Sequence, residues 1–256
     1  MYTDDPHDFY AASCYIRGLL DTYGFYRLRE HQHRMEHQLS LHRNETKTMQ
    51  KNAAFTACSL TTLQDADLDH AFRYRGTQDN SWFMRFIGFD LSLFTYEGMY
   101  KTPALVYLAI YYLTHDIPIR LVTPEMDASS GITYLAGISE DKTNISILLS
   151  NYDSFDTTYT LNVVNLPWNT TYTVVHYLID DKHHLQIIEE TMFSLSSYTT
   201  TQTLKSNTVH FIHLTNSTVT PDEGPNVASI PLLLRILLLD PITHLLDILI
   251  LMLIFS

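Results

Sequence analysis

Four histidines lie close together in a polar segment of the sequence, and they are the first candidates for chemistry. They are His31, His33, His37 and His42. Imidazole nitrogens at this spacing could bind a transition metal through two or three of the rings. No carboxylate-supported ligand pattern accompanies them, and the hydrophilic face of a helix explains them equally well. We therefore expect no metal site and no cofactor.

Sequence patterns of several other catalytic classes are missing. The chain has no GxSxG nucleophile elbow, and its 8 glycines form no phosphate-binding loop. Cys14 and Cys58 lie far apart, and neither belongs to a CxxC pair. We therefore expect two buried free thiols rather than a zinc knuckle or a disulfide framework.

The composition is that of a folded, acidic protein. The 256 residues are 45% hydrophobic, which is enough to bury one large core or two modest ones. Sixteen basic and 28 acidic side chains give a net charge of −12, so a polyanion would meet net repulsion. We therefore exclude nucleic acid as a partner.

The two ends of the chain bear on its location. Residues 1–10 are acidic and polar, without the basic and then apolar order of a signal peptide, so we expect a secreted form to begin upstream. Residues 230–256 are almost wholly apolar, although charged residues interrupt them. This tail is open to three interpretations: a membrane or lipid-anchor signal, a packed amphipathic helix pair, or translated non-coding sequence. Four Asn-x-Ser/Thr triplets would matter only in a secreted chain, and they begin at Asn44, Asn144, Asn169 and Asn216.

Helical periodicity dominates the first half of the chain. Residues 8–26 and 53–63 each place apolar side chains on one helical face. Residues 102–115 predict a further helix, because Pro103 fits its first turn and Pro118 prevents its continuation.

Beyond Pro124 the periodicity changes from helical to alternating. Short runs rich in β-branched and aromatic residues are separated by turn sequences, and we expect strands within residues 131–138, 144–151, 158–165, 171–179 and 208–214. Five or more strands at this spacing indicate an antiparallel sandwich or a small barrel. The boundary between an α/β half and an all-β half is therefore near residues 120–130.

Several segments of the sequence, taken in order, form one pattern: Ile16–Phe25, Asn52–Ala57, Leu63–Asp69, Phe72–Gly76 and Glu97-Gly98 with Lys101–Ala104. In this order they resemble the end of the catalytic domain in family 39 glycoside hydrolases, the group that includes β-xylosidases. They are similar to the sixth and seventh helices, the eighth strand, and the turn and helix that follow it. Residues 134–214 resemble the β domain that follows the barrel in this family.

The resemblance implies an α/β plus all-β chain, in which a partial (β/α)8 TIM-barrel end precedes an antiparallel β-sandwich. We expect residues 1–122 to form the C-terminal portion of the barrel and residues 123–216 to form the sandwich. Residues 217–256 would be a linker and hydrophobic tail.

Enzymes of this family use two carboxylates. In the retaining mechanism, one carboxylic acid protonates the leaving oxygen, and a carboxylate about 5 Å away attacks the anomeric carbon. The resemblance places the acid/base glutamate on a fourth strand that would precede Met1. The nucleophile position falls on Glu36, with Glu30 as the lesser candidate, although the Trp and Asn that follow the family's nucleophile are absent here. The alternative for Glu36 is a solvated charge in a polar segment.

The resemblance also suggests residues that bind substrate. Arg73, Tyr74 and Arg75 would end the eighth strand, the face where barrel enzymes place their sites. A structural ion pair with the acidic residues 65–69 is the alternative for the arginines. Trp82, in the following loop, could stack on a sugar ring or plug the barrel. Trp168, on a turn of the sandwich, could bind carbohydrate or pack in the core.

The resemblance therefore implies a glycoside hydrolase that, in its full form, cleaves β-xyloside-like substrates with retention. Its partner would be carbohydrate, and its location extracellular or at the cell surface if the full form carries a signal peptide. Because the acid/base strand lies outside this sequence, we expect a truncated or degenerate form with little or no activity. A non-catalytic carbohydrate-binding or cell-surface module, tethered by residues 230–256, is the alternative. A third possibility is a product that does not fold stably, because an open barrel fragment exposes sheet edges.

Overall fold

A computed structural model describes the chain over residues 2–3, 5, 7–22, 31–32, 36–37, 45–65, 70–71, 92–95, 97–124, 131–194 and 196–216. The chain divides into two compact units, residues 1–220 and 221–256. The predicted hydrophobic tail at residues 230–256 lies outside the described residues. Among the helices that are described, none combines the length and hydrophobicity needed to cross a bilayer.

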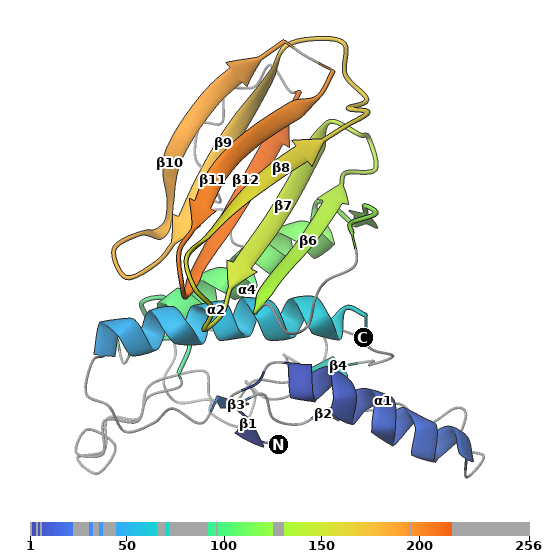
Figure 1. Ribbon diagram of the computed structural model, residues 1–256, viewed down its shortest axis with the longest axis vertical. Helices are drawn as coiled ribbons and strands as arrows, with labels where there is room; N and C mark the ends of the chain where they lie inside the picture. Colours follow the sequence, from blue (N-terminus) through green and yellow to red (C-terminus); the bar gives the residue numbers. More distant parts are fainter. Residues whose placement is uncertain are drawn as a thin grey trace. The chain divides into compact units, whose positions relative to one another are not determined.

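Helices and very short strands alternate in the first 115 residues (Figure 1). The elements are β1 (Tyr2–Thr3), α1 (His7–Thr22), β2 (His31–Gln32), β3 (Glu36–His37), α2 (Glu45–Leu63), β4 (His70–Ala71) and α4 (Thr102–His115). Helix α4 has the predicted bounds, because Pro103 lies in its first turn and the chain leaves the helix before Pro118. Helix α2 begins eight residues before the predicted start at residue 53, since its first two turns are polar.

The rest of the described chain is β-structure, and its pairing is antiparallel throughout. The strands are β5 (Ile119–Arg120), β6 (Ile132–Ile138), β7 (Asn144–Asn151), β8 (Thr157–Val163), β9 (Tyr172–Ile179), β10 (His184–Phe193), β11 (Tyr198–Leu204) and β12 (Thr208–Thr215). Six of them form one sheet in the order β10-β9-β12-β7-β6-β5. Among the described strands, β8 and β11 pair only with each other and form a two-stranded ribbon.

Alternation along the central strands gives the six-stranded sheet two apolar faces. One face packs against α2 and α4, and its core includes Phe55 and Phe211. The other face packs against the β8–β11 ribbon, and its core includes Tyr172, Leu204 and Ile212. The chain therefore builds layers of helix, six-stranded sheet and ribbon, in which each core is closed by a different kind of element (Figure 1).

Two of the longer strands, β10 and β11, were not predicted. Strand β10 lies at the edge of the sheet, where most of its side chains are exposed, and two register shifts interrupt its pairing with β9. Edge position and irregular pairing both weaken the alternation on which a strand prediction depends. Strand β11 is a threonine-rich run, YTTTQTL, whose outward side is fully polar.

The prediction for the thiols is right for one cysteine and wrong for the other. Cys58 is buried on α2, where burial raises the pKa of its thiol to about 12, and both cysteines are free. Cys14 is exposed on α1, because the face of this helix that carries Cys14 and Tyr15 points away from the described core.

The all-β part of the predicted fold is confirmed as a mostly antiparallel, sandwich-like arrangement. In the first half, the described residues show three helices and two short parallel strand pairs. The predicted barrel end stays a prediction.

Candidate functional site

The residue predicted as nucleophile lies on one of the short parallel strands. Glu36 begins β3, which pairs in parallel with β1 through Tyr2↔Glu36 and Thr3↔His37. Five residues earlier, β2 pairs in parallel with β4 through His31↔His70. The segment 31–37 is therefore joined to a strand that precedes α1 and to a strand that follows α2. This is the connectivity of consecutive β/α units, which place functional residues at the carboxyl ends of their strands.

Most of the predicted substrate-binding residues cannot be compared with the structure. Arg73, Tyr74, Arg75 and Trp82 lie outside the described residues, as do Glu30 and two of the four histidines, His33 and His42. His31 and His37 are described as backbone positions of β2 and β3. Within the described part of the chain, no group of three potential ligands could hold a metal ion.

The acidic residues proposed as partners of the arginines at 73 and 75 have one member in the described region. Asp65 follows the last turn of α2, and its carboxylate accepts a hydrogen bond from Arg120 Nη1 of β5. Both side chains are partly exposed, so this ion pair contributes little stability. It does, however, join the end of α2 to the edge strand of the six-stranded sheet.

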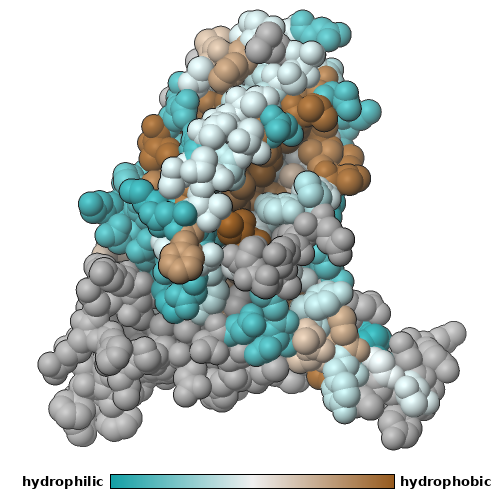
Figure 2. Space-filling view, viewed as in Figure 1, coloured by the Kyte–Doolittle hydropathy of each residue, from teal (hydrophilic) through white to brown (hydrophobic). Residues whose placement is uncertain are grey.

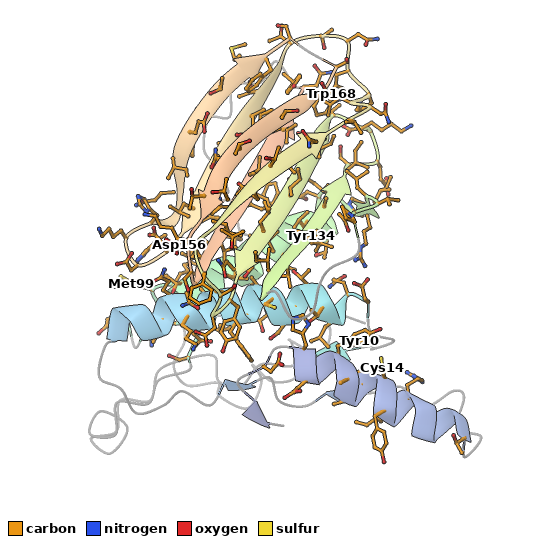
Figure 3. The ribbon with its side chains drawn as sticks, viewed as in Figure 1. Tyr10, Cys14, Met99, Tyr134, Asp156 and Trp168 are labelled. Atoms are coloured by element: carbon orange, nitrogen blue, oxygen red, sulfur yellow. The ribbon has the colours of Figure 1, made fainter. Side chains whose placement is uncertain are left out.

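Trp168 is a core residue rather than a sugar-binding one. Its side chain is only 4% exposed, and its ring packs against Tyr172 at a centroid distance of 5.5 Å. The indole Nε1 donates a hydrogen bond of 2.6 Å to the carbonyl oxygen of Lys142. Although Trp168 lies on the turn Pro167–Asn169, its ring packs in the core between the ribbon and the sheet (Figure 3). The core interpretation of Trp168 is therefore confirmed.

Two histidines and a tyrosine meet between the sheet and the ribbon. His176 of β9 and His210 of β12 lie with ring centroids 4.7 Å apart, in an edge-to-face arrangement. Tyr159 of β8 places its hydroxyl 3.2 Å from His210 Nδ1. His176 is 1% exposed, and neither of its ring nitrogens has a hydrogen-bond partner among the described residues. Sequence reasoning missed this cluster, because each residue is an ordinary strand position until the pairing of β9 with β12 brings them together.

Burial keeps these histidines neutral. It lowers the pKa of His176 to about 4, and burial together with the neighbouring His176 lowers the pKa of His210 to about 3. Burial also raises the pKa of Tyr159 well above its ordinary range. Because the cluster is enclosed and neutral at physiological pH, it is suited to packing rather than to acid–base catalysis.

A serine and a histidine are also paired on the helix-facing side of the sheet. Ser146 Oγ of β7 lies 2.8 Å from His213 Nδ1 of β12. Ser146 is fully buried, so it offers no access to a substrate. This pair satisfies two polar groups inside the core, and we assign it no chemistry.

The loop between β7 and β8 presents an exposed aromatic ring. Phe155 is 91% exposed, whereas its carbonyl oxygen accepts hydrogen bonds from Asn151 Nδ2 at 2.9 Å and Thr157 Oγ1 at 3.0 Å. The turn sequence at residues 151–153 predicted a loop here, but no sequence signal distinguished this phenylalanine from a core residue.

Comparison with known proteins relates this geometry to one group of enzymes. No protein-family model and no curated protein sequence matches the chain. Among solved structures, it is similar to a glucosidase from Croceicoccus marinus, with 23% identity over 85% of this chain and 53% of that one, and a TM-score of 0.69. It is also similar to the GH39 enzyme from Xanthomonas axonopodis pv. citri, with 12% identity over 81% of this chain and 48% of that one, and a TM-score of 0.61.

A monomeric β-xylosidase from Caulobacter crescentus CB15 has a TM-score of 0.57, with 12% identity over 82% of this chain and 50% of that one. The chain spans about half the length of each of these proteins. At these identities the likeness establishes the fold: the described antiparallel sheet with its helices is glycoside hydrolase-like and matches a sandwich-like region of such enzymes.

Proposed function

We propose that this chain supplies the last strands and helices of the barrel, and the β-sandwich that follows it, in a retaining glycoside hydrolase of the family 39 type. The observation that carries the proposal is the order of the parallel pairs. Strands β1 and β3, then β2 and β4, pair in parallel and alternate with α1, α2 and α4 before the antiparallel sheet begins. Consecutive β/α units produce this order, and the similar solved structures are glycoside hydrolases.

In this proposal Glu36 is the nucleophile. Its carboxylate oxygen would bond to the anomeric carbon, while the bond from that carbon to the leaving oxygen breaks and the leaving group keeps the electron pair. Water would then hydrolyse the glycosyl ester and regenerate the carboxylate. The acid/base glutamate implied by the resemblance is not in this sequence, so the leaving oxygen receives no proton from the chain. We infer that the chain alone is weakly active or inactive on ordinary β-xylosides.

An activated substrate tests this inference, because dinitrophenolate departs without being protonated. We expect slow turnover of 2,4-dinitrophenyl β-xyloside and turnover of methyl β-xyloside at least about 100-fold slower, since only the second requires the absent acid. Glu36→Gln should abolish the activity on the dinitrophenyl substrate, whereas Glu30→Gln is the matched control and should retain it. Equal rates for the wild type and Glu36→Gln would refute Glu36 as the nucleophile.

A non-catalytic carbohydrate-binding module is the second candidate, and the exposed Phe155 on a well-anchored loop of the sandwich favours it. Retention on insoluble xylan without turnover of the dinitrophenyl xyloside would support this function over hydrolysis.

With either function, we propose an extracellular or cell-surface location for the protein. Among the Asn-x-Thr triplets, Asn169 is exposed in the loop between β8 and β9 and is accessible to a glycan.

A further inference from the structure

The loop that carries Phe155 is held on two sides. On one side it contacts the turn between β11 and β12: Ser206 N donates to Asp156 Oδ1 at 2.8 Å, and Asp153 N donates to Asn207 Oδ1 at 3.0 Å. These bonds add to the two that fix the Phe155 carbonyl. The backbone of the loop is therefore ordered, although the phenyl ring it presents is almost fully exposed to solvent.

On its other side the loop is joined to the first half of α2. Lys51 Nζ lies 2.7 Å from Asp153 Oδ2 and 5.4 Å from the centre of the Tyr152 ring. Gln50 Nε2 donates to the Ser206 carbonyl oxygen at 3.4 Å. The loop that carries Phe155 is therefore held by α2 as well as by the sandwich.

Helix α2 is the next described element after the strand that carries Glu36. The helix begins at Glu45, nine residues after Glu36, and Lys51 follows its start by six residues, which is about 9 Å along the axis. A helix that follows a parallel strand begins at the carboxyl end of that strand, which is the side where barrel enzymes hold their substrates. The connectivity therefore places the loop of Phe155 at the same end of the β/α units as the carboxyl end of β3.

We propose that Phe155 is a stacking platform for a sugar ring of a longer, uncharged β-linked oligosaccharide, at a distal subsite that the sandwich contributes. The inference rests on the proposed function, because it assumes that the glycan reaches this end of the chain. An aromatic face suits the C–H surface of a pyranose ring and needs no charge on the ligand.

The surface next to Phe155 fits the same ligand. The outward side chains of the ribbon, which begins two residues after Phe155, are hydroxyl and amide groups: Thr158, Thr160, Asn162, Thr199, Thr201 and Thr203. Figure 2 shows pale residues of intermediate hydropathy on this face. These ribbon side chains are uncharged, and on a chain of net charge −12 an uncharged glycan avoids the repulsion that a polyanionic one would meet.

The test compares long and short ligands by isothermal titration calorimetry on the full chain, with xylohexaose and xylobiose as probes. We expect the wild type to bind xylohexaose more tightly than xylobiose. Phe155→Ala should weaken xylohexaose binding about five- to tenfold and leave xylobiose binding unchanged, because only the longer ligand reaches the ring. Phe155→Trp should preserve the affinity, and xylohexaose should change the fluorescence of the new indole.

Val164→Ala is the matched control, because Val164 is also an exposed apolar residue, 65% accessible, beyond the other end of β8. It should leave both affinities unchanged. Thermal melting of each variant establishes that it is folded. Equal xylohexaose affinity in the wild type and Phe155→Ala would overturn the proposal, as would a wild type that binds xylohexaose no better than xylobiose.

The experiments distinguish failure of the hydrolase proposal from failure of the Phe155 stacking site. If the dinitrophenyl xyloside is not turned over but Phe155→Ala still weakens xylohexaose binding, the hydrolase proposal fails and the stacking site stands. If Glu36-dependent turnover is found but Phe155→Ala binds xylohexaose normally, the stacking site fails and the hydrolase proposal stands.

Discussion

The two faces of the six-stranded sheet are covered by different elements, and they tolerate polar groups differently. Against α2 and α4, the sheet buries aliphatic and aromatic side chains, and the histidine on that side, His213, has the hydroxyl of Ser146 as a partner. Against the ribbon, the sheet buries His176, whose ring nitrogens have no hydrogen-bond partner among the described residues. Burial lowers the pKa of His213 to about 4, as it does that of His176. Both sides therefore bury a neutral histidine, and they differ in whether its ring nitrogens have a hydrogen-bond partner among the described residues.

The largest effect is expected on the helical side. Phe55 of α2 is fully buried and packs edge-to-face on Tyr152 with ring centroids 5.3 Å apart. Phe55→Ala leaves a cavity between α2 and the sheet and should lower the free energy of unfolding by about 3–5 kcal/mol. Urea denaturation followed by circular dichroism measures this change. A loss below about 1 kcal/mol would mean that α2 does not stabilise the sheet.

An intermediate effect is expected from acid on the ribbon side. Because burial lowers the pKa of His176 to about 4, the unfolded chain, in which histidine titrates near its ordinary value of about 6.5, binds the proton first. The stability is therefore complete above about pH 6.5 and falls as the pH drops toward 4. Between pH 7 and pH 4, the wild type should lose roughly 2–3 kcal/mol more than His176→Phe.

Denaturation curves at several pH values measure that difference. His184→Gln is the matched control for removal of an imidazole, because His184 is exposed on β10. If His176→Phe loses stability with acid as steeply as the wild type, the acid sensitivity arises elsewhere in the chain and not from His176.

The smallest effect is expected for one hydrogen bond on the ribbon side. Tyr159→Phe removes the hydroxyl that lies 3.2 Å from His210 Nδ1 and should cost about 1 kcal/mol at pH 7. The same change should add little in the background of His210→Phe, because the partner is already absent. A double-mutant cycle in urea measures this coupling. Additive effects of the two substitutions would show that the bond does not stabilise the fold.

Parts of the fold could be predicted where the local signal was strong. Helix α4 has a proline in its first turn and another beyond its end, and strands β6, β7, β9 and β12 alternate in short runs between turn sequences. Strand β10 was missed because an exposed edge strand with register shifts has little alternation. The start of α2 was missed because its first turns are polar. They contact residues that are distant in the sequence, such as Asp153 and Ser206, and these contacts cannot be recognised from the local sequence.

The candidate functional residues also differ in whether the local sequence could reveal them. Glu36 was proposed from a resemblance that depends on the order of several short sequence segments. Residues 73–75 and 82 remain predictions, because they lie outside the described region. The contact of His176 with His210 depends on long-range strand pairing, and the exposure of Phe155 depends on hydrogen bonds to residues on either side of it. Neither property has a signal in the local sequence.

The most direct measurement of the central claim is covalent trapping with 2,4-dinitrophenyl 2-deoxy-2-fluoro-β-xyloside. The fluorine slows hydrolysis of the glycosyl ester, so the intermediate accumulates and peptide mass spectrometry can locate it. Our account predicts one fluoroxylosyl group on the peptide that contains Glu36, absent in Glu36→Gln and present in Glu30→Gln. A label on a different residue, or an unlabelled wild-type chain, would contradict the assignment of Glu36 as the nucleophile.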